Sequence, residues 1–208
     1  MKMDSIIFDV DGTLWNSTES VAKSWTGYLK NQEKIDLTLT SERLISLFGQ
    51  TLPAIARQLF PDFSEAEQLR IMDGCCQAEH KALLKEPVPV YDGLEDALKG
   101  LYKKYPLFIV SNCQAGYIEV FLETTGLGHY FQGHLCPGDT GVAKAENIQK
   151  IAQMYHLSSP VYVGDTLGDF ETCQKAGVPF IFASYGFGEV KHPWKSISQP
   201  TDLLDICL

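Results

Sequence analysis

Short apolar runs recur along the chain, and most of them end in small, acidic or amide residues. The runs are SIIFDVD (5–11), PLFIVSN (106–112), PVYVGD (160–165) and PFIFAS (179–184), with GHLCPGD (133–139) as a weaker candidate. They are rich in β-branched and aromatic residues and do not alternate with polar residues, which is typical of strands buried on both faces. The pattern therefore predicts short strands in the interior of a sheet.

Helical periodicity separates these runs. The i, i+3, i+4, i+7 spacing of an amphipathic helix occurs at Leu94, Ala97, Leu98 and Leu101, and again at Ile148, Ile151, Ala152 and Tyr155. Strands that alternate with helices indicate βαβ units and a mostly parallel sheet. Because ligands of such sheets bind beyond the carboxyl ends of the strands, the polar residues at those ends become the candidate functional residues.

The first two strands are farther apart than a βαβ unit requires. Ser111 lies 102 residues after Asp9, whereas a crossover needs about 30 residues. The sequence between them has helical apolar patterns, so we expect a helical domain of residues 16–86 inserted into a core of residues 1–15 and 87–208. The proline-containing stretch KEPVPVYDG (85–93) is the expected return hinge, because proline keeps the chain extended.

Capping signals support helices in this insert. Asn16 can cap the first of them, with Glu19 reaching back to the same turn, and Ser64 and Glu67 form the pattern of a capping box farther along. Both signals precede apolar stripes, so the insert is expected to be built from helices with a buried face of their own.

Composition narrows the class of protein. The chain has 208 residues, of which 45% are hydrophobic and 21% charged, and its formal net charge is −9. These values are typical of a globular protein, and the acidic balance argues against nucleic acid as a partner. The apolar run at the N-terminus is too short for a signal sequence or a membrane span, so we expect a cytoplasmic protein, a monomer or weak dimer, with no membrane partner.

Cysteine and histidine spacing gives little support for disulfides or zinc. The six cysteines include no C-x-x-C pair, and the five histidines are dispersed. Scattered cysteines without a secretory signal are best interpreted as reduced core residues. A structural zinc site would need clustered ligands, which the sequence does not offer.

Two acidic clusters carry the candidate chemistry. Asp9 and Asp11 follow the first apolar run, and Asp165 and Asp169 follow a later one in VGDTLGDFETC. Carboxylates that converge at one sheet edge repel each other unless a cation neutralises them, and a few hard oxygen ligands favour Mg²⁺. An EF-hand calcium loop beginning at Asp9 is excluded, because its sixth and twelfth positions would be leucine and serine.

Two further sites along the chain can bind phosphate. Ser111 and Asn112 end a strand with a hydroxyl and an amide, and Lys144 opens the helical stretch KAENIQKIAQMY. A cation at a helix N-terminus attracts anions. Taken singly, a Ser-Asn pair is usually a turn and a lysine is usually a surface charge, but each of these follows its own strand in order.

At this point the chain resembles the haloacid dehalogenase superfamily. DVDGT (9–13) is similar to the first motif of that family, the Ser111-Asn112 pair to the second, Lys144 to the third and GDTLGD (164–169) to the fourth. The insert resembles the helical cap of the subgroup that includes phosphoglycolate phosphatase and β-phosphoglucomutase. One departure is Ala145, where family members often have proline after the lysine. The resemblance implies an α/β fold, with a Rossmann-like parallel-sheet core and an inserted α-helical cap domain.

The resemblance also implies roles for the strand-end residues. Asp9 would be the nucleophile that forms an aspartyl-phosphate, and Asp11 the general acid and then base. Mg²⁺ would be held by the Asp9 carboxylate, the Asp11 backbone carbonyl and Asp165, with Asp169 behind a water. The groups expected to hold the phosphoryl oxygens are Gly12, Thr13, Ser111, Asn112 and Lys144. Because family dehalogenases and phosphonatases lack an acid at the position of Asp11, cleavage of carbon–halogen and carbon–phosphorus bonds is not expected.

Substrate contacts are expected from the cap. The stretch LFGQTLPAI (47–55) resembles the family's cap loop, which makes Phe48, Gly49, Gln50 and Thr51 candidates for specificity, although a plain interhelix turn is the alternative. Trp15 and Asn16 are candidate hinge residues, and Trp25 and Trp194 are expected to serve packing.

The predicted function is a magnesium-dependent phosphatase acting on a small phosphorylated metabolite. A phosphomutase could use the same site, provided that its cap excluded water. A non-catalytic phosphate-binding regulatory protein is a third possibility, but binding alone has no use for an acid/base at Asp11.

Overall fold

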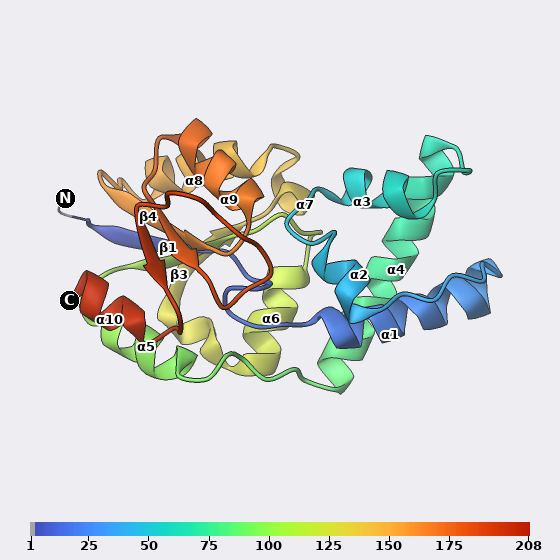
Figure 1. The fold of residues 1–208 in the computed structure, drawn as a ribbon, viewed down its shortest axis with the longest axis horizontal. Coiled ribbons are helices and arrows are strands. Elements are labelled where there is room, and N and C mark those ends of the chain that lie inside the picture. Colours follow the sequence, from blue (N-terminus) through green and yellow to red (C-terminus); the bar gives the residue numbers. More distant parts are fainter. Residues whose placement is uncertain (1–2) are drawn as a thin grey trace.

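The structure, a computed structural model, describes residues 3–208. Its centre is a parallel sheet with the strand order β3-β2-β1-β4-β5-β6 (Figure 1). The strands are β1 (Ser5–Phe8), β2 (Leu107–Val110), β3 (Phe131–Leu135), β4 (Pro160–Gly164), β5 (Phe180–Ala183) and β6 (Lys195–Ile197). The predicted α/β class with a parallel sheet is confirmed.

Helices cover both faces of the sheet. One face packs against α5 (Leu94–Leu101), α6 (Tyr117–Thr125) and α10 (Asp202–Cys207), and the other against α8 (Lys144–Met154) and α9 (Leu167–Ala176). The side chains of β1 alternate between these layers, because Ile6 and Phe8 join the first core and Ile7 joins the second. Burial on both faces explains why the central strands have uninterrupted apolar sequences.

The strand boundaries differ from the prediction at the sheet edges. β3 begins two residues before the expected run 133–139. β6 was not predicted, because its three residues KSI lie at the sheet edge with two exposed side chains and form no apolar run. Two short helical turns complete the core, the 3₁₀ turn η2 (Leu127–Tyr130) and α7 (Pro137–Thr140).

The sequence between β1 and the return to the core forms a separate group of helices. It contains α1 (Thr18–Tyr28), the π-turn η1 (Leu29–Glu33), α2 (Ser41–Ile45), α3 (Leu52–Leu59) and α4 (Glu65–Lys85). These helices enclose a hydrophobic cluster of their own, in which Trp25 is almost fully buried. In Figure 1 they lie to one side of the sheet, beyond the carboxyl ends of the strands.

The capping signals of this group are partly as expected. Ser64 and Glu67 form the predicted capping box at the start of α4. At α1 the Asn16 side chain caps the first turn as predicted, because it accepts hydrogen bonds from the backbone N–H and the hydroxyl of Thr18, at 3.1 and 2.6 Å. The helix itself is assigned from Thr18 with Ser17 at the N-cap, so Glu19 does not occupy the position of a capping-box partner.

The two segments that connect this group of helices to the core, around Trp15 and around Val90, lie side by side. Trp15 forms an antiparallel bridge with Val90, and the backbone N–H of Tyr91 donates to the Leu14 carbonyl at 3.2 Å. Trp15 is fully buried against Phe121. The limits 16 and 86 predicted for the cap stay a prediction, but both connecting segments are adjacent in space as a hinge requires.

Other expectations can be compared directly with the structure. All six cysteines are free and buried, and Trp194 is 39% exposed. Within residues 3–208, every helix is either too short or too polar to cross a bilayer.

Candidate active site

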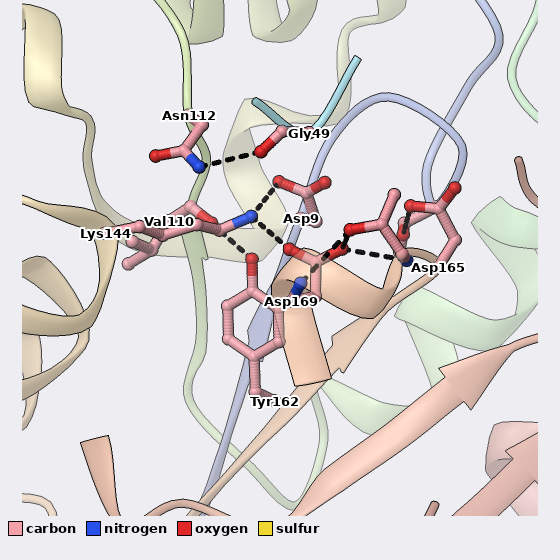
Figure 2. A network of polar contacts seen from close by, with 10 residues as sticks. Asp9, Gly49, Val110, Asn112, Lys144, Tyr162, Asp165 and Asp169 are labelled. Carbon is pink, nitrogen blue, oxygen red and sulfur yellow. Dashed lines mark hydrogen bonds and ion pairs between the residues drawn. The ribbon is translucent and has the colours of Figure 1, made fainter. Parts of the chain in front are cut away.

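The strand-end residues meet at one edge of the sheet. Asp9 follows β1, Ser111 and Asn112 follow β2, and Asp165 follows β4, and these three strands are neighbours. Because all of them run parallel, their carboxyl ends carry these side chains to a common place. Figure 2 shows Asp9, Asp165 and Asp169 pointing toward one another there, with Lys144 entering from α8.

Lys144 lies between two carboxylates in the interior. Its Nζ donates to Asp9 Oδ1 at 2.8 Å and to Asp169 Oδ1 at 2.5 Å, and all three side chains are nearly inaccessible to solvent (Figure 2). Nζ also lies 5.2 Å from the centre of the Tyr162 ring. Burial alone would lower the pKa of Lys144, but the carboxylates of Asp169 and Asp9 outweigh it and raise the pKa. The lysine is therefore a fixed positive charge beside Asp9.

Asp165 is held by the loops around it. Its carboxylate accepts hydrogen bonds from the backbone N–H of Phe187 at 2.7 Å and from the Thr13 hydroxyl at 3.3 Å. Gly12 has φ +79°, and a Cβ on it would lie 2.0 Å from Asp165 Oδ2. A Cβ on Gly186 would lie 2.3 Å from the Asp165 Cβ. The two glycines thus leave the space that Asp165 occupies at the sheet edge.

The carboxylates fit a divalent cation. Oxygen atoms of Asp9, Asp165 and Asp169 all lie within 4.8 Å of one another, and all three residues are buried. Burial raises the pKa of Asp9, against the influence of Lys144, and raises that of Asp165 well above its usual value. Keeping these three buried carboxylates ionised is costly unless a positive charge lies among them. A hard cation such as Mg²⁺ suits such a cluster of oxygen ligands.

Asp169 differs from the other two in its contacts. Its Oδ1 pairs with Lys144, while Oδ2 accepts from the backbone N–H and hydroxyl of Thr166 at 3.0 and 2.7 Å. Together with the return bond to the Thr166 hydroxyl, this is a capping box at the start of α9. Both oxygens of Asp169 therefore already accept hydrogen bonds from the protein, which is consistent with an indirect place in a metal site.

The Asp11 side chain is held by residues outside the group of Asp9, Asp165 and Asp169. Its Oδ1 accepts hydrogen bonds from the Ser17 hydroxyl at 2.6 Å and from the Tyr117 hydroxyl at 2.8 Å. Burial is the main cause that raises the pKa of Asp11 to about 7, and the two hydroxyl hydrogen bonds oppose it. A carboxyl with such a pKa can both donate and accept a proton near neutral pH.

The helical group closes over these residues. A cavity of about 30 Å³ lies between it and the core, and Asp9, Asp11, Ser111 and Asn112 contribute to its walls. That volume holds about one water molecule. Asn112 Nδ2 donates to the Gly49 carbonyl at 2.9 Å (Figure 2). The Phe48 and Phe187 rings lie 6.3 Å apart. The loop that carries Gly49 is thus in direct contact with the core.

The predicted cap residues are distributed over two hollows. Phe48, Gly49 and Gln50 line the cavity beside Asp9. Thr51 lines a neighbouring hollow of about 370 Å³ instead. Gln50 also accepts a hydrogen bond from Gln58 at 2.6 Å, which holds its side chain on the helical group.

Seven residues of the cavity wall were missing from the predicted site. Four of them have polar groups that make hydrogen bonds there, namely Trp25, Glu79, Gln114 and Tyr117, and the other three are Leu52, Ile55 and Cys113. Trp25 was expected to serve packing alone, yet its indole N–H donates to Glu79 at 2.7 Å. The sequence offered some indication of Gln114 and Tyr117, because both closely follow the end of β2, where site residues are expected. The indication for Glu79 was weaker and consisted of an acidic residue within the apolar stripe of α4.

Comparisons with known proteins agree with this arrangement. The sequence profile described as "Haloacid dehalogenase-like hydrolase" matches residues 6–183. A pyrophosphatase PpaX of Listeria innocua is 29% identical, covering 84% of this chain and 80% of that protein. A phosphoglycolate phosphatase of Rhodobacter capsulatus is 26% identical, with coverages of 88% and 85%.

Solved structures share the fold. A haloacid dehalogenase-like hydrolase from Streptococcus pneumoniae superimposes with a TM-score of 0.82 at 20% identity, covering 98% of both chains. CbbY from Rhodobacter sphaeroides, solved in complex with phosphate, gives a TM-score of 0.82 at 16% identity and covers 97% of this chain and 96% of that one. The resemblance to the haloacid dehalogenase superfamily inferred from the sequence is confirmed. Because the family profile matches residues 6–183, which are most of the chain, the chain belongs to the haloacid dehalogenase-like hydrolase family.

Proposed function

We propose that the protein is a magnesium-dependent phosphatase that hydrolyses a small phosphorylated metabolite through an aspartyl-phosphate at Asp9. The observation that supports this most strongly is the buried group of Asp9, Lys144, Asp165 and Asp169, in which Asp9 also lines the cavity between the helical group and the core. The names of the phosphatase relatives point in the same direction.

In the first step a carboxylate oxygen of Asp9 attacks phosphorus. An oxygen–phosphorus bond forms, the bond from phosphorus to the leaving alcohol breaks, and the alcohol oxygen takes the proton of Asp11. Both hydroxyl hydrogen bonds to Asp11 end on Oδ1, which leaves Oδ2 available for this transfer. A positioned general acid contributes roughly 10²–10⁴-fold where the leaving group needs a proton.

In the second step the ionised Asp11 removes a proton from water. The water oxygen attacks phosphorus, the bond to Asp9 breaks, and inorganic phosphate and the free Asp9 carboxylate result. The pKa of Asp11 near 7 suits a group that must serve as acid and then as base.

The remaining site residues offset charge on the phosphoryl group. Lys144 presents a permanent positive charge beside Asp9, and the Ser111 and Asn112 side chains line the same cavity. Mg²⁺, held by Asp9, Asp165 and the Asp11 carbonyl with Asp169 behind them, would neutralise the phosphoryl oxygens electrostatically. We assign Gly12 and Thr13 chiefly to the support of Asp165, because the Thr13 hydroxyl donates to its carboxylate and a Cβ on Gly12 would collide with that carboxylate.

Residues 16–86 act in this proposal as a cap that opens for substrate. A cavity of about 30 Å³ is too small for a phosphate ester, so the cap has to move outward. The hydrogen bond from Asn112 to Gly49 would break in that motion and free the amide for a phosphoryl oxygen.

Hydrolysis of p-nitrophenyl phosphate tests the proposal. We expect turnover with Mg²⁺, none in excess chelator, and recovery when Mg²⁺ is restored. Adding a sugar bisphosphate distinguishes the phosphomutase alternative, which would then convert a sugar monophosphate into its isomer without releasing phosphate. Full activity in excess chelator would refute the metal assignment.

A further inference from the structure

The cap-facing side of the site has an unusual charge pattern. Among the described residues, the cavity above Asp9 and Asp11 has Glu79 in its wall and no Lys, Arg or His side chain. Two neighbouring hollows, of about 370 and 380 Å³, share Leu52 with it and add His80 as their single basic side chain. In these three hollows the leaving group of a substrate meets no lysine or arginine, and in the one beside Asp9 it meets the carboxyl groups of Asp11 and Glu79.

Glu79 is fixed at this boundary by donors from both sides. It lies on α4 with 3% of its surface exposed. The Trp25 indole N–H donates to Oε2 at 2.7 Å, and the Gln114 amide donates to Oε1 at 3.0 Å. Burial is the largest cause that raises the pKa of Glu79 to about 8, and the Gln114 and Trp25 hydrogen bonds oppose it.

His80 does not supply a positive charge here. Its Nε2 lies 3.0 Å from the same Gln114 Nε2 that donates to Glu79. An amide nitrogen has two protons to donate, so His80 Nε2 accepts the second one and the ring is neutral. Burial lowers the pKa of His80, which agrees with that protonation state.

These contacts determine which leaving groups the site can accommodate. A carboxylate or phosphate on the leaving alcohol would lose its water next to Asp11 and Glu79 without gaining a counter-charge, and uncompensated buried charge is costly. A hydroxyl or ammonium group has protons to donate to Glu79. An ammonium group would also favour the ionised form of Glu79 and pair with it.

We propose that the substrate is a small phosphomonoester whose leaving alcohol carries a hydroxyl or ammonium group and no negative charge, and that Glu79 accepts a hydrogen bond from that group. This inference rests on the phosphatase function proposed above and narrows its substrate class to polyol and amino-alcohol phosphates. It also separates this chain from two of its named relatives, because pyrophosphate and phosphoglycolate both release an anionic leaving group.

Matched two-carbon esters test the inference. The kcat/KM values of the intact protein with Mg²⁺ are compared for 2-hydroxyethyl phosphate, O-phosphoethanolamine and 2-phosphoglycolate, with inorganic pyrophosphate as a further substrate. We expect the two esters without a negative leaving group to exceed phosphoglycolate by roughly tenfold or more, since a buried anion without a counter-charge is costly. This comparison uses the unmodified protein and does not depend on any variant folding.

A variant then assigns the selectivity to Glu79. Glu79→Gln keeps the shape of the side chain but cannot ionise to pair with an ammonium group, so we expect O-phosphoethanolamine turnover to fall by roughly tenfold, the factor that one lost ion pair of about 1.4 kcal/mol gives. The rate with p-nitrophenyl phosphate, whose leaving group carries no hydroxyl or ammonium group, should fall by a smaller factor, so that the ratio of the O-phosphoethanolamine rate to the p-nitrophenyl phosphate rate decreases. Glu86→Gln, at the exposed end of the same helix, is the control and should change neither.

Two results would overturn the inference while leaving the phosphatase proposal intact. One is p-nitrophenyl phosphate turnover together with phosphoglycolate or pyrophosphate as the best small substrate. The other is an unchanged ratio between O-phosphoethanolamine and phosphoglycolate in Glu79→Gln. If p-nitrophenyl phosphate itself is not hydrolysed in the presence of Mg²⁺, the proposed function fails, and the inference fails with it.

Discussion

Replacing Lys144 by methionine would remove the ammonium group between Asp9 and Asp169 while keeping most of the aliphatic stem. In the structure the ammonium donates to both carboxylates, at 2.8 and 2.5 Å, and the three side chains are at most 4% exposed. The substitution would therefore leave two buried carboxylates without their positive partner, which is the costly way to break a buried ion pair.

The expected loss is large for a single residue. Removing one partner of a buried pair costs about 3–5 kcal/mol. For a chain of this size, 1 kcal/mol corresponds to about 2–4 °C in the unfolding midpoint, so the midpoint should fall by roughly 6–20 °C. Mg²⁺ should reduce the difference in unfolding midpoint between Lys144→Met and the unmodified protein, because a cation bound at the carboxylates neutralises part of their charge.

Thermal unfolding in chelator, followed by circular dichroism and repeated with Mg²⁺, measures both effects. Lys150→Met is the matched control, because Lys150 lies on the same helix with its side chain exposed; it should shift the midpoint by little. The double variant Lys144→Met with Asp169→Asn should regain part of the loss, since it removes one of the unpaired charges. If Lys144→Met unfolded at the same temperature as Lys150→Met, Lys144 would not be balancing the carboxylate group and our description of the site would be wrong.

Three further predictions concern catalysis. Asp9→Asn should retain less than about a hundredth of the wild-type turnover while remaining folded, since losing a nucleophile usually costs several powers of ten; a circular dichroism spectrum checks the fold, and greater residual turnover would exclude Asp9 as the nucleophile. Ca²⁺ should fail to replace Mg²⁺ in the phosphatase assay, because it prefers more ligands and looser geometry; equal rates with the two ions would contradict the assigned magnesium site. Gly12→Ala should lower kcat by roughly a hundredfold, as a 1 Å misplacement in a site can do, because the added Cβ would lie 2.0 Å from Asp165 Oδ2; wild-type kcat in this variant would mean that Asp165 can move without consequence.

The sequence predicted the parts of this protein that local patterns determine. Each central strand is an apolar run that ends in a polar residue, so both the parallel sheet and the meeting of Asp9 with Asp165 followed from the pattern. β6 could not be predicted in the same way, since two of its three side chains are exposed at the sheet edge. Its strand conformation comes from pairing with β5, a tertiary contact.

The cap side of the site was the part that the sequence left open. Glu79 occurs in the middle of α4, and its significance depends on how that helix packs against Trp25 and the Gln114 loop. Asn112 was predicted to hold phosphate, yet its amide donates to the Gly49 carbonyl in this closed arrangement. Both contacts join residues that are far apart in the sequence, and no local pattern specifies them.

The most direct test of the account is a search for phosphate bound covalently to Asp9. Asp11→Asn removes the group that is proposed to activate water, so the phosphoenzyme should accumulate with p-nitrophenyl phosphate, whose leaving group needs little protonation. Mass spectrometry of the rapidly quenched variant should find one added phosphoryl group on the peptide that contains Asp9, and none when Asp9→Asn is added. A phosphoryl group on another residue, or its absence from Asp11→Asn during continuing turnover, would contradict the aspartyl-phosphate mechanism.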